Sequence, residues 1–260
     1  MKKIVFILIL FLAGIYFISV RFNDLENLEP KKSILDKKPF QNVESLTKNG
    51  VTKTEVSDSD IEIFKLDKQR FTVQILSASY GQHVSTWSNN TTNTISINGG
   101  YFHEDYTPSG YLVVDGKRIG DKKFDEDKTG MVVIQDNKLS IRDLKVQPLK
   151  EGENFDYALQ SYPFLIRNGV GAIKEDSRQE YRRSAIGLDK EDNIYLIIVN
   201  SSDLSLYEFM NELLKSDIPF IDVLNLDGGP SSGIGIHIGD YNEVIDSVFP
   251  VPNILQFHLL

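Results

Sequence analysis

Residues 225–233 constrain the fold of this chain more than any other segment, because they join two apolar runs through a glycine-rich turn. Residues 218–224 precede the turn and the alternating residues 234–238 follow it, so the pattern predicts two β-strands with a tight connection. An Asp-Gly pair between apolar runs is a common hairpin signal with no chemistry attached. The paired glycines, followed by Ser231 and Ser232, are equally suited to direct backbone N–H groups at an anion. Both interpretations stay open on this segment alone.

Composition excludes several classes of function. The chain has 260 residues, 41% of them hydrophobic, which is enough for one domain of about 200 residues plus an appendage. Its net charge is −9 and its basic residues do not cluster, so a nucleic-acid partner is not expected. The absence of cysteine excludes disulfides, thiolate nucleophiles and cysteine-based metal sites. The four histidines are scattered, so the sequence predicts no histidine-rich metal site.

The N-terminus predicts a membrane anchor. Residues 4–20 are uncharged and apolar, and as a helix they would span about 25 Å. No small-residue cleavage site follows them, so we expect a retained transmembrane helix rather than a cleaved signal peptide. Lys2 and Lys3 place residues 1–3 in the cytoplasm as a short stub and the rest of the chain outside, as a single-pass membrane protein.

Residues 21–50 are polar and mixed in charge, which is typical of a linker that holds a domain away from the membrane. A short helix is expected within this linker, near residues 42–48. The folded domain is then predicted to occupy residues 51–260.

Short apolar or alternating runs separated by turn residues dominate the predicted domain, and they are typical of β-strands. About a dozen strands are expected on this basis. The runs are residues 61–66, 71–76, 94–97, 111–115, 131–135, 139–142, 157–160, 164–166, 185–188, 194–199, 218–224, 234–238 and 254–260.

One main helix is expected at about residues 205–216. Ser205 and Glu208 have the spacing of a capping box, and Pro219 lies just beyond the end of the pattern. A single helix among many strands does not match a regular alternation of strands and helices. The predicted fold class is therefore α+β, a single domain dominated by sheet.

The acidic segment 121–127 superficially suggests a calcium site, but it lacks the spacing of ligands that a calcium loop needs. A solvated loop is the simpler interpretation. The sequence predicts no metal site and requires no cofactor, and it does not decide whether a divalent cation takes part.

Two predicted strand ends share one pattern, in which a polar side chain is followed by two glycines, in residues 98–100 and 227–229. Together with other segments, in order, they resemble the motifs of the phosphodiester glycosidase family, whose members release a sugar from a phosphodiester and include bacterial proteins linked to exopolysaccharide or cell-wall polymers. The matching segments are residues 97–110, 158–169, 182–188, 225–232 and 251–253. The resemblance covers about residues 50–260, without the cysteines of the animal members.

The resemblance implies where a catalytic site would lie. Asp227 is the expected nucleophile or general base, and Arg183 has the planar fork that suits a phosphate. Asn98 is expected to bind sugar hydroxyls or to orient a water. A second carboxylate is wanted, and either Glu104 or Asp105 is the nearest candidate, although both fit an exposed loop equally well. The residues expected to contact substrate are Gly99, Gly100, Tyr101, His103, Arg182, Ser184, Gly228, Gly229, Ser231 and Ser232.

The expected function is that of a membrane-anchored, extracytoplasmic hydrolase that cleaves a glycosyl phosphodiester in a cell-wall or exopolysaccharide-type glycan. Two alternatives stay open: a non-catalytic module of the same fold that binds glycosyl phosphates, and an anchored structural or assembly protein whose glycine motifs only make turns. If Asn98 and Asp227 lie close together in the fold, they can share one cleft. If they lie far apart, the structural or assembly protein is favoured.

Overall fold

The computed structural model describes residues 42–56, 60–89, 91–120, 125–200 and 203–260. The cytoplasmic stub and transmembrane anchor expected at residues 1–20 lie outside the described residues, as does most of the expected linker. Among the residues that are described, no helix is both long and apolar enough to cross a membrane. Gln41–Leu260 form one compact unit.

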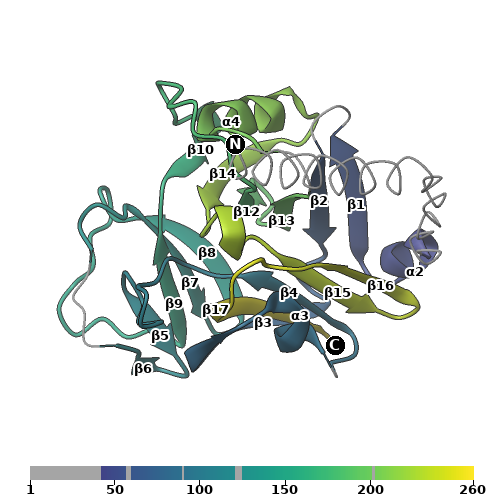
Figure 1. Ribbon diagram of the computed structural model, residues 1–260, viewed down its shortest axis with the longest axis horizontal. Coiled ribbons are helices and arrows are strands. Elements are labelled where there is room, and N and C mark those ends of the chain that lie inside the picture. Colours follow the sequence, from purple (N-terminus) through teal and green to yellow (C-terminus); the bar gives the residue numbers. More distant parts are fainter. Residues whose placement is uncertain (1–41, 57–59, 90, 121–124, 201–202) are drawn as a thin grey trace, which may run out of the picture. The chain divides into compact units, whose positions relative to one another are not determined.

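The described residues build three antiparallel sheets, and the largest has seven strands in the order β1-β2-β13-β12-β14-β10-β11 (Figure 1). Its central strands are continuous apolar runs that are buried on both faces, as expected for strands covered on both sides. In sheet order the strands are β1 (Val51–Val56), β2 (Ile61–Leu66), β13 (Ile194–Val199), β12 (Ser184–Asp189), β14 (Phe220–Asn225), β10 (Phe164–Arg167) and β11 (Val170–Gly171).

Two further sheets have five strands each. The second sheet has, in order, β16 (Tyr241–Ile245), β15 (Ile234–Ile238), β4 (Thr94–Asn98), β17 (Val251–Leu259) and β3 (Phe71–Gln82). The third has β6 (Lys117–Arg118), β5 (Leu112–Val114), β9 (Tyr157–Ser161), β7 (Gly130–Gln135) and β8 (Lys138–Asp143).

One hydrophobic core joins the three sheets. Ile186 from the first sheet, Ile97 from the second and Leu159 from the third belong to the same buried cluster. Each is at most 2% exposed, so the sheets depend on one another for burial of their inner faces. The sheet-dominated fold class predicted from the sequence is thereby confirmed. The sequence suggested fewer strands: β6 and β11, which have two residues each, are too short to show a periodic pattern, and β1 and β16 were also missed.

The main helix is also confirmed. Helix α4 (Leu206–Lys215) begins at Ser205, whose hydroxyl accepts from the Glu208 N–H while the Glu208 carboxylate accepts from the Ser205 N–H. Phe209, Met210 and Leu213 bury its apolar face in a second core cluster, which includes residues of β2, β10, β12, β13 and β14. The helix therefore covers the outer face of the seven-stranded sheet (Figure 1). The short helix α3 (Val84–Ser88) lies beside β15 and β4.

Helix α2 (Val43–Lys48) forms where the sequence placed a short helix, but it belongs to the compact unit and not to the linker. Leu46 is fully buried in the main core cluster. The carbonyl of Lys48 accepts a hydrogen bond of 2.6 Å from Arg70 Nη1, which joins the helix to the β2–β3 turn. The compact unit thus extends to residues before the boundary expected at residue 50, where one apolar residue among polar ones gives only a weak periodic signal.

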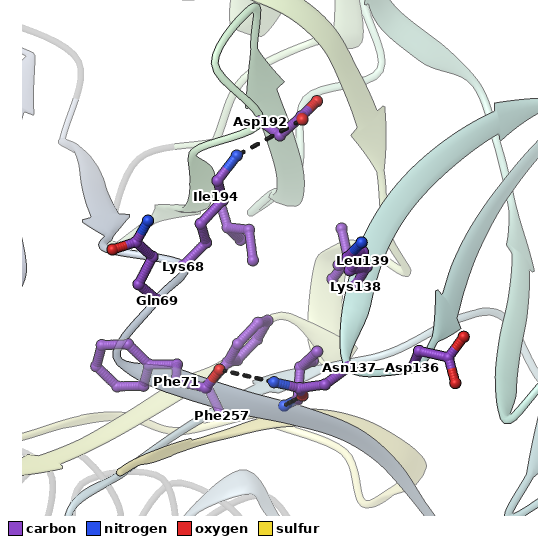
Figure 2. A pocket seen from close by; sticks show the side chains of 11 residues that line it. Lys68, Gln69, Phe71, Asp136, Asn137, Lys138, Leu139, Asp192, Ile194 and Phe257 are labelled. Atoms are coloured by element: carbon purple, nitrogen blue, oxygen red, sulfur yellow. Dashed lines mark hydrogen bonds and ion pairs between the residues drawn. The ribbon is translucent and has the colours of Figure 1, made fainter.

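A cavity of about 640 Å³ opens at the turns that follow β7 and β12, with Phe71, Leu139 and Phe257 among its lining residues (Figure 2). At its rim, Lys68 Nζ lies 3.5 Å from a carboxylate oxygen of Asp192. Strand β12 has this cavity at one end and Ser184 at the other, so the cavity is remote from the predicted site.

The burial of Leu46 generates a stability prediction. Leu46→Ala should lower the free energy of unfolding of the full chain by about 2–5 kcal/mol, because a buried leucine is replaced by a cavity. Val43→Ala in the same helix is the control, since Val43 is 48% exposed, and it should change the value by less than about 0.5 kcal/mol. Chemical denaturation measures both. Equal values for the two variants would place α2 outside the cooperative unit.

Candidate active site

The two glycine motifs are bound directly to each other. Asn98, the last residue of β4, donates from Nδ2 to the Asp227 carbonyl at 2.7 Å, and its Oδ1 accepts from the Gly233 N–H at 3.1 Å. The backbone adds two bonds, from the Asp227 N–H to the Gly99 carbonyl and from the Asn98 N–H to the Gly233 carbonyl. Asn98 and Asp227 therefore belong to a single site.

These contacts give Asn98 a role that the sequence did not suggest. Its side chain is fully buried, and both polar atoms are used inside the protein rather than by sugar hydroxyls or a water. A buried amide must find partners for both of its polar atoms. Here those partners are the backbone groups on either side of the residue 228–232 loop, so Asn98 holds the loop that carries Asp227.

Asn253 packs against both glycines of the first motif and requires a glycine at position 99. The Asn253 side chain accepts from the Gly100 N–H at 2.7 Å, and a Cβ on Gly99 would lie 2.0 Å from the same oxygen. That distance is too short for any other residue at position 99. The Gly99 and Gly100 backbones, expected at the substrate, are therefore bound to β17 and to Asp227.

The Asp227 carboxyl group is half-buried and lies two residues after the end of β14. Burial raises its pKa to about 6, although hydrogen bonds from the Ser231 side chain and the Gly228 N–H act in the opposite direction. The Gly228 and Ser231 groups thus face the carboxyl group itself. A carboxyl group with a pKa near neutrality is suited to proton transfer, and such values gather at functional sites.

Arg183 lies beside the Asp227 loop and is only 8% exposed. Its Nε donates to the Leu204 carbonyl at 2.8 Å and its Nη2 to the Gln179 carbonyl at 2.6 Å. Its Nη1 faces Gly228, where a Cβ would lie 3.5 Å away. Burial lowers the pKa of Arg183, but an arginine remains a cation at neutral pH. The two backbone acceptors fix the guanidinium with one edge toward the Asp227 loop.

The neighbouring residues Arg182 and Ser184 support the same loop. Arg182 donates from Nη1 and Nη2 to the Asp246 carbonyl, and its own carbonyl accepts from the Gly229 N–H at 2.8 Å. The Ser184 hydroxyl donates to the Asp227 carbonyl at 3.0 Å. Both residues, expected to contact substrate, thus hold the backbone of the loop, and a contact with substrate stays a prediction.

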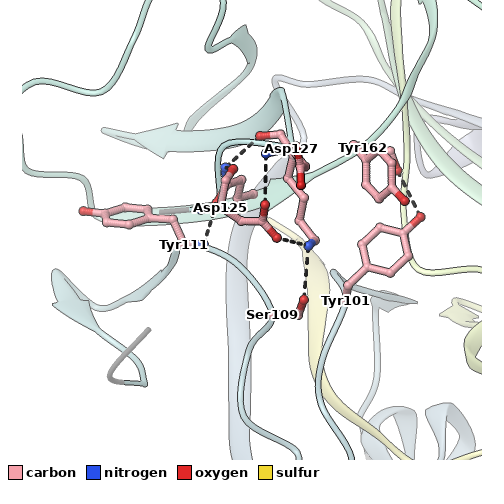
Figure 3. Close-up of polar contacts among 8 residues, drawn as sticks. Tyr101, Ser109, Tyr111, Asp125, Asp127 and Tyr162 are labelled. Atoms are coloured by element: carbon pink, nitrogen blue, oxygen red, sulfur yellow. Dashed lines mark hydrogen bonds and ion pairs between the residues drawn. The ribbon is translucent and has the colours of Figure 1, made fainter. Parts of the chain in front are cut away.

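Two tyrosines, Tyr101 and Tyr162, form one wall of the site beside Asp227. Neither Tyr162 nor Asn225 was assigned a role from the sequence. The Tyr101 hydroxyl donates to the Tyr162 carbonyl at 3.0 Å (Figure 3). It also accepts from Asn225 Nδ2 at 2.8 Å. The two rings lie 5.4 Å apart between centroids. Burial, followed by the negative charge of Asp227, raises the pKa of Tyr101. Asn225 precedes Asp227 by two residues, a spacing that places both on one side of a strand and that could have identified it.

Lys128 lies behind this wall and was also missed. It is 8% exposed, and its Nζ lies 5.7 Å from the Tyr101 ring centroid and 5.8 Å from that of Tyr162. The ammonium group donates to the Ser109 hydroxyl and to the Asp125 carboxylate (Figure 3). The described part of the expected solvated loop, from Asp125 onward, is therefore partly ordered by a buried cation. The sequence around Lys128 has no pattern that indicates the burial of this lysine.

His103, Glu104 and Asp105 lie in a loop of their own. Glu104 and Asp105 are exposed, and the Asp105 carboxylate accepts from both the N–H and the hydroxyl of Thr107. His103 is half-buried and bonds through its backbone to Thr107 and Tyr106. The described contacts tie these residues to the loop, and none of them joins Glu104 or Asp105 to Asp227.

Three buried polar atoms near Asp227 have no hydrogen-bond partner among the described residues: Ser232 Oγ, Asn225 Oδ1 and Arg182 Nε. Groups of this kind are usually satisfied by water or by a ligand. The described residues contain no cluster of three or more histidine or acidic side chains that could hold a metal ion. What the site offers is one carboxyl group of raised pKa, a fixed guanidinium, the Ser232 hydroxyl without a partner and an aromatic wall.

Comparison with known proteins adds an independent finding. The model of the phosphodiester glycosidase family matches residues 91–258, about two thirds of the chain. No match was found among curated proteins.

Solved structures resemble the fold. The catalytic domain of zebrafish N-acetylglucosamine-1-phosphodiester alpha-N-acetylglucosaminidase, auto-inhibited by its pro-peptide, has a TM-score of 0.60 at 18% identity, over 81% of this chain and 82% of that one. A hypothetical protein from Synechocystis has a TM-score of 0.55 at 15% identity, over 81% of this chain and 61% of that one. At these identities the two structures support the assignment of the fold alone.

The raised pKa of Asp227 predicts a pH-dependent stability difference. Because the folded-state pKa of about 6 lies above the ordinary 3.8, protonated Asp227 stabilises the fold below pH 4, and this contribution is lost as pH rises through 6. As the pH rises from 4 to 8, the free energy of unfolding of Asp227→Asn should therefore increase by about 2–3 kcal/mol relative to that of wild type.

Denaturation of both proteins across this pH range measures the difference. Asp240→Asn, on the exposed β15–β16 turn, controls for the loss of one negative charge. A difference between Asp227→Asn and wild type that stays constant with pH would show that burial does not act on this carboxyl group.

Proposed function

The chain belongs to the phosphodiester glycosidase family and is thus a glycosidase, and on that premise we propose that it hydrolyses a glycosyl phosphodiester in a cell-wall or exopolysaccharide-type glycan. The proposal includes the retained anchor at residues 4–20, which would hold the domain on the outer side of the membrane. The observation that carries the proposal is the Asp227 carboxyl group of raised pKa beside the fixed guanidinium of Arg183.

In this proposal the anomeric carbon of the sugar lies at Asp227. The carboxylate either attacks this carbon or takes a proton from the water that does so, and both routes stay open because no second carboxylate contacts Asp227 through a described bond. In either route the bond between the anomeric carbon and the phosphate oxygen breaks. The electron pair leaves with the phosphate, and water supplies the hydroxyl group of the released sugar.

The phosphate is proposed to lie between Arg183 and the residue 228–229 backbone. A phosphate that leaves with an added negative charge is stabilised by a cation that is already in place. Arg183 meets this requirement because its Nε and Nη2 are held by backbone carbonyls, which orient Nη1 toward Gly228. The half-buried position of the site strengthens such charge interactions relative to water.

Turnover of aryl glycosyl phosphodiesters by the full chain tests the proposal. Asp227→Asn should lower kcat by at least about a thousandfold, because the amide can neither attack nor take a proton. In the wild type kcat/KM should rise with pH up to about 6 and then level, as Asp227 ionises. Asp240→Asn, on the exposed β15–β16 turn, is the matched control and should retain most of its activity.

Two outcomes would count against the proposal. Full activity of Asp227→Asn would place the chemistry elsewhere in the fold. Binding of the substrates by wild type without any turnover would instead favour a glycan-binding module.

A further inference from the structure

An exposed apolar patch lies next to Arg183, formed by Tyr181, Pro230, Val248 and Phe249. Tyr181 is 49% exposed, Val248 60% and Phe249 59%, and Pro230 is exposed as well. Single exposed apolar residues are ordinary, but a contiguous group beside a candidate site marks a binding surface.

The patch is held in place by hydrogen bonds. The Pro230 carbonyl accepts from the Val248 N–H at 2.7 Å and from the Phe249 N–H at 3.0 Å. The Tyr181 backbone exchanges two hydrogen bonds with Leu204, of 3.2 and 3.0 Å. The Arg183 guanidinium lies over the Tyr181 ring, 5.3 Å from its centroid. The exposed side chains therefore stand on fixed backbone and need little ordering when a ligand binds.

The patch is continuous with the candidate site through the chain itself. Asp227 is followed by Gly228 beside Arg183 Nη1, and then by Gly229, where a Cβ would lie 3.8 Å from the Tyr181 ring. Gly229 has a φ of +59°, a conformation that favours glycine, and it leads directly to Pro230 in the patch.

The order of strands gives the site a direction. Strand β14 lies between β12, which is preceded by Tyr181 and Arg183, and β10, which is preceded by Tyr162. Tyr162 and Tyr181 therefore flank the Asp227 loop from opposite sides. In the proposed function the sugar lies at Asp227, beside the Tyr101 wall, and the phosphate lies at Arg183. The aglycone, which is the group on the far side of the phosphate, then extends over the patch.

The side chains of the patch define what this group can be. Pro230, Val248 and Phe249 have no polar side-chain atoms, and the two terminal nitrogens of Arg182 nearby donate to the Asp246 carbonyl. The Asp246 carboxylate accepts from Ser85, and Asp203 is exposed near both arginines, so an anionic aglycone would be repelled. A sugar ring needs several polar partners, and among the four side chains of the patch only Tyr181 carries a polar group.

From this surface we propose that the substrate carries an apolar alkyl or prenyl-type chain as its aglycone, which packs on Tyr181, Pro230, Val248 and Phe249. The inference rests on the proposed hydrolysis of a glycosyl phosphodiester and narrows the substrate to a glycosyl unit whose phosphate is attached to an apolar chain instead of to another sugar of the glycan. It assigns specificity to residues that are separate from Asp227 and Arg183.

Three diesters of the same sugar phosphate test this inference with the full chain. They are the methyl, octyl and hexosyl diesters of a set of hexose 1-phosphates, comprising glucose, galactose and their N-acetylamino counterparts. Wild type should favour the octyl over the methyl diester by at least about tenfold in kcat/KM, since each buried methylene contributes about fourfold. The double variant Val248→Ser/Phe249→Ser should lose about this whole factor from the octyl-to-methyl ratio.

Val244→Ser is the matched control, because Val244 is 42% exposed on β16 but lies outside the patch, and it should leave the octyl-to-methyl ratio unchanged. Tyr181→Phe keeps the ring and should retain the octyl preference, whereas Tyr181→Ser should weaken it. An unchanged ratio in the double variant, or a loss confined to the hexosyl diester, would overturn the proposal.

If the wild type cleaves none of the diesters, the proposed function fails separately, and calorimetry then decides the role of the patch. Tighter binding of the octyl than the methyl diester, lost in the double variant, would support an apolar ligand there. Equal binding of the two diesters would reject it.

Discussion

The hydrogen bonds that join Asn98 to the Asp227 loop are the interaction on which the rest of the site depends. Asn98 ends β4 in the second sheet, whereas Asp227 follows β14 in the first, so this one amide connects two sheets at the edge where chemistry is proposed. Because Asn98 is fully buried, removing either of its bonds would leave a polar group without a partner. The loop position is therefore set by the junction of the sheets and not by the loop sequence alone.

Each property of Asp227 relevant to chemistry follows from this junction. The loop is drawn against Gly99, which brings the carboxyl group into a half-buried position and raises its pKa. The same loop places Gly228 beside Arg183 and leads through Gly229 to the apolar patch of Tyr181, Pro230, Val248 and Phe249. Carboxyl group, cation and patch thus lie in sequence along one turn, which is why one substrate is proposed to contact all three.

The sequence predicted features with a local signature and missed those created by packing. The helix capped by Ser205 and Glu208 and the sheet-dominated class were predictable from periodicity, and the family from its ordered motifs. The family resemblance placed Asp227 and Arg183 in one site, and their proposed roles stay predictions. The burial of Lys128 behind two tyrosines and the use of Asn98 as a link between sheets depend on distant residues. No local pattern encodes such contacts.

Amide hydrogen exchange in Asn98→Ala tests the central claim most directly. The Gly233 N–H loses its acceptor in this variant, and the Asp227 N–H loses the docking that holds it to the Gly99 carbonyl. Both amides should exchange at least about tenfold faster than in wild type, since each lost buried bond costs about 1–3 kcal/mol. The amides of the β7–β8 hairpin should keep their wild-type rates. Unchanged exchange at Gly233 and Asp227 would contradict the account, because the loop would then hold its position without Asn98.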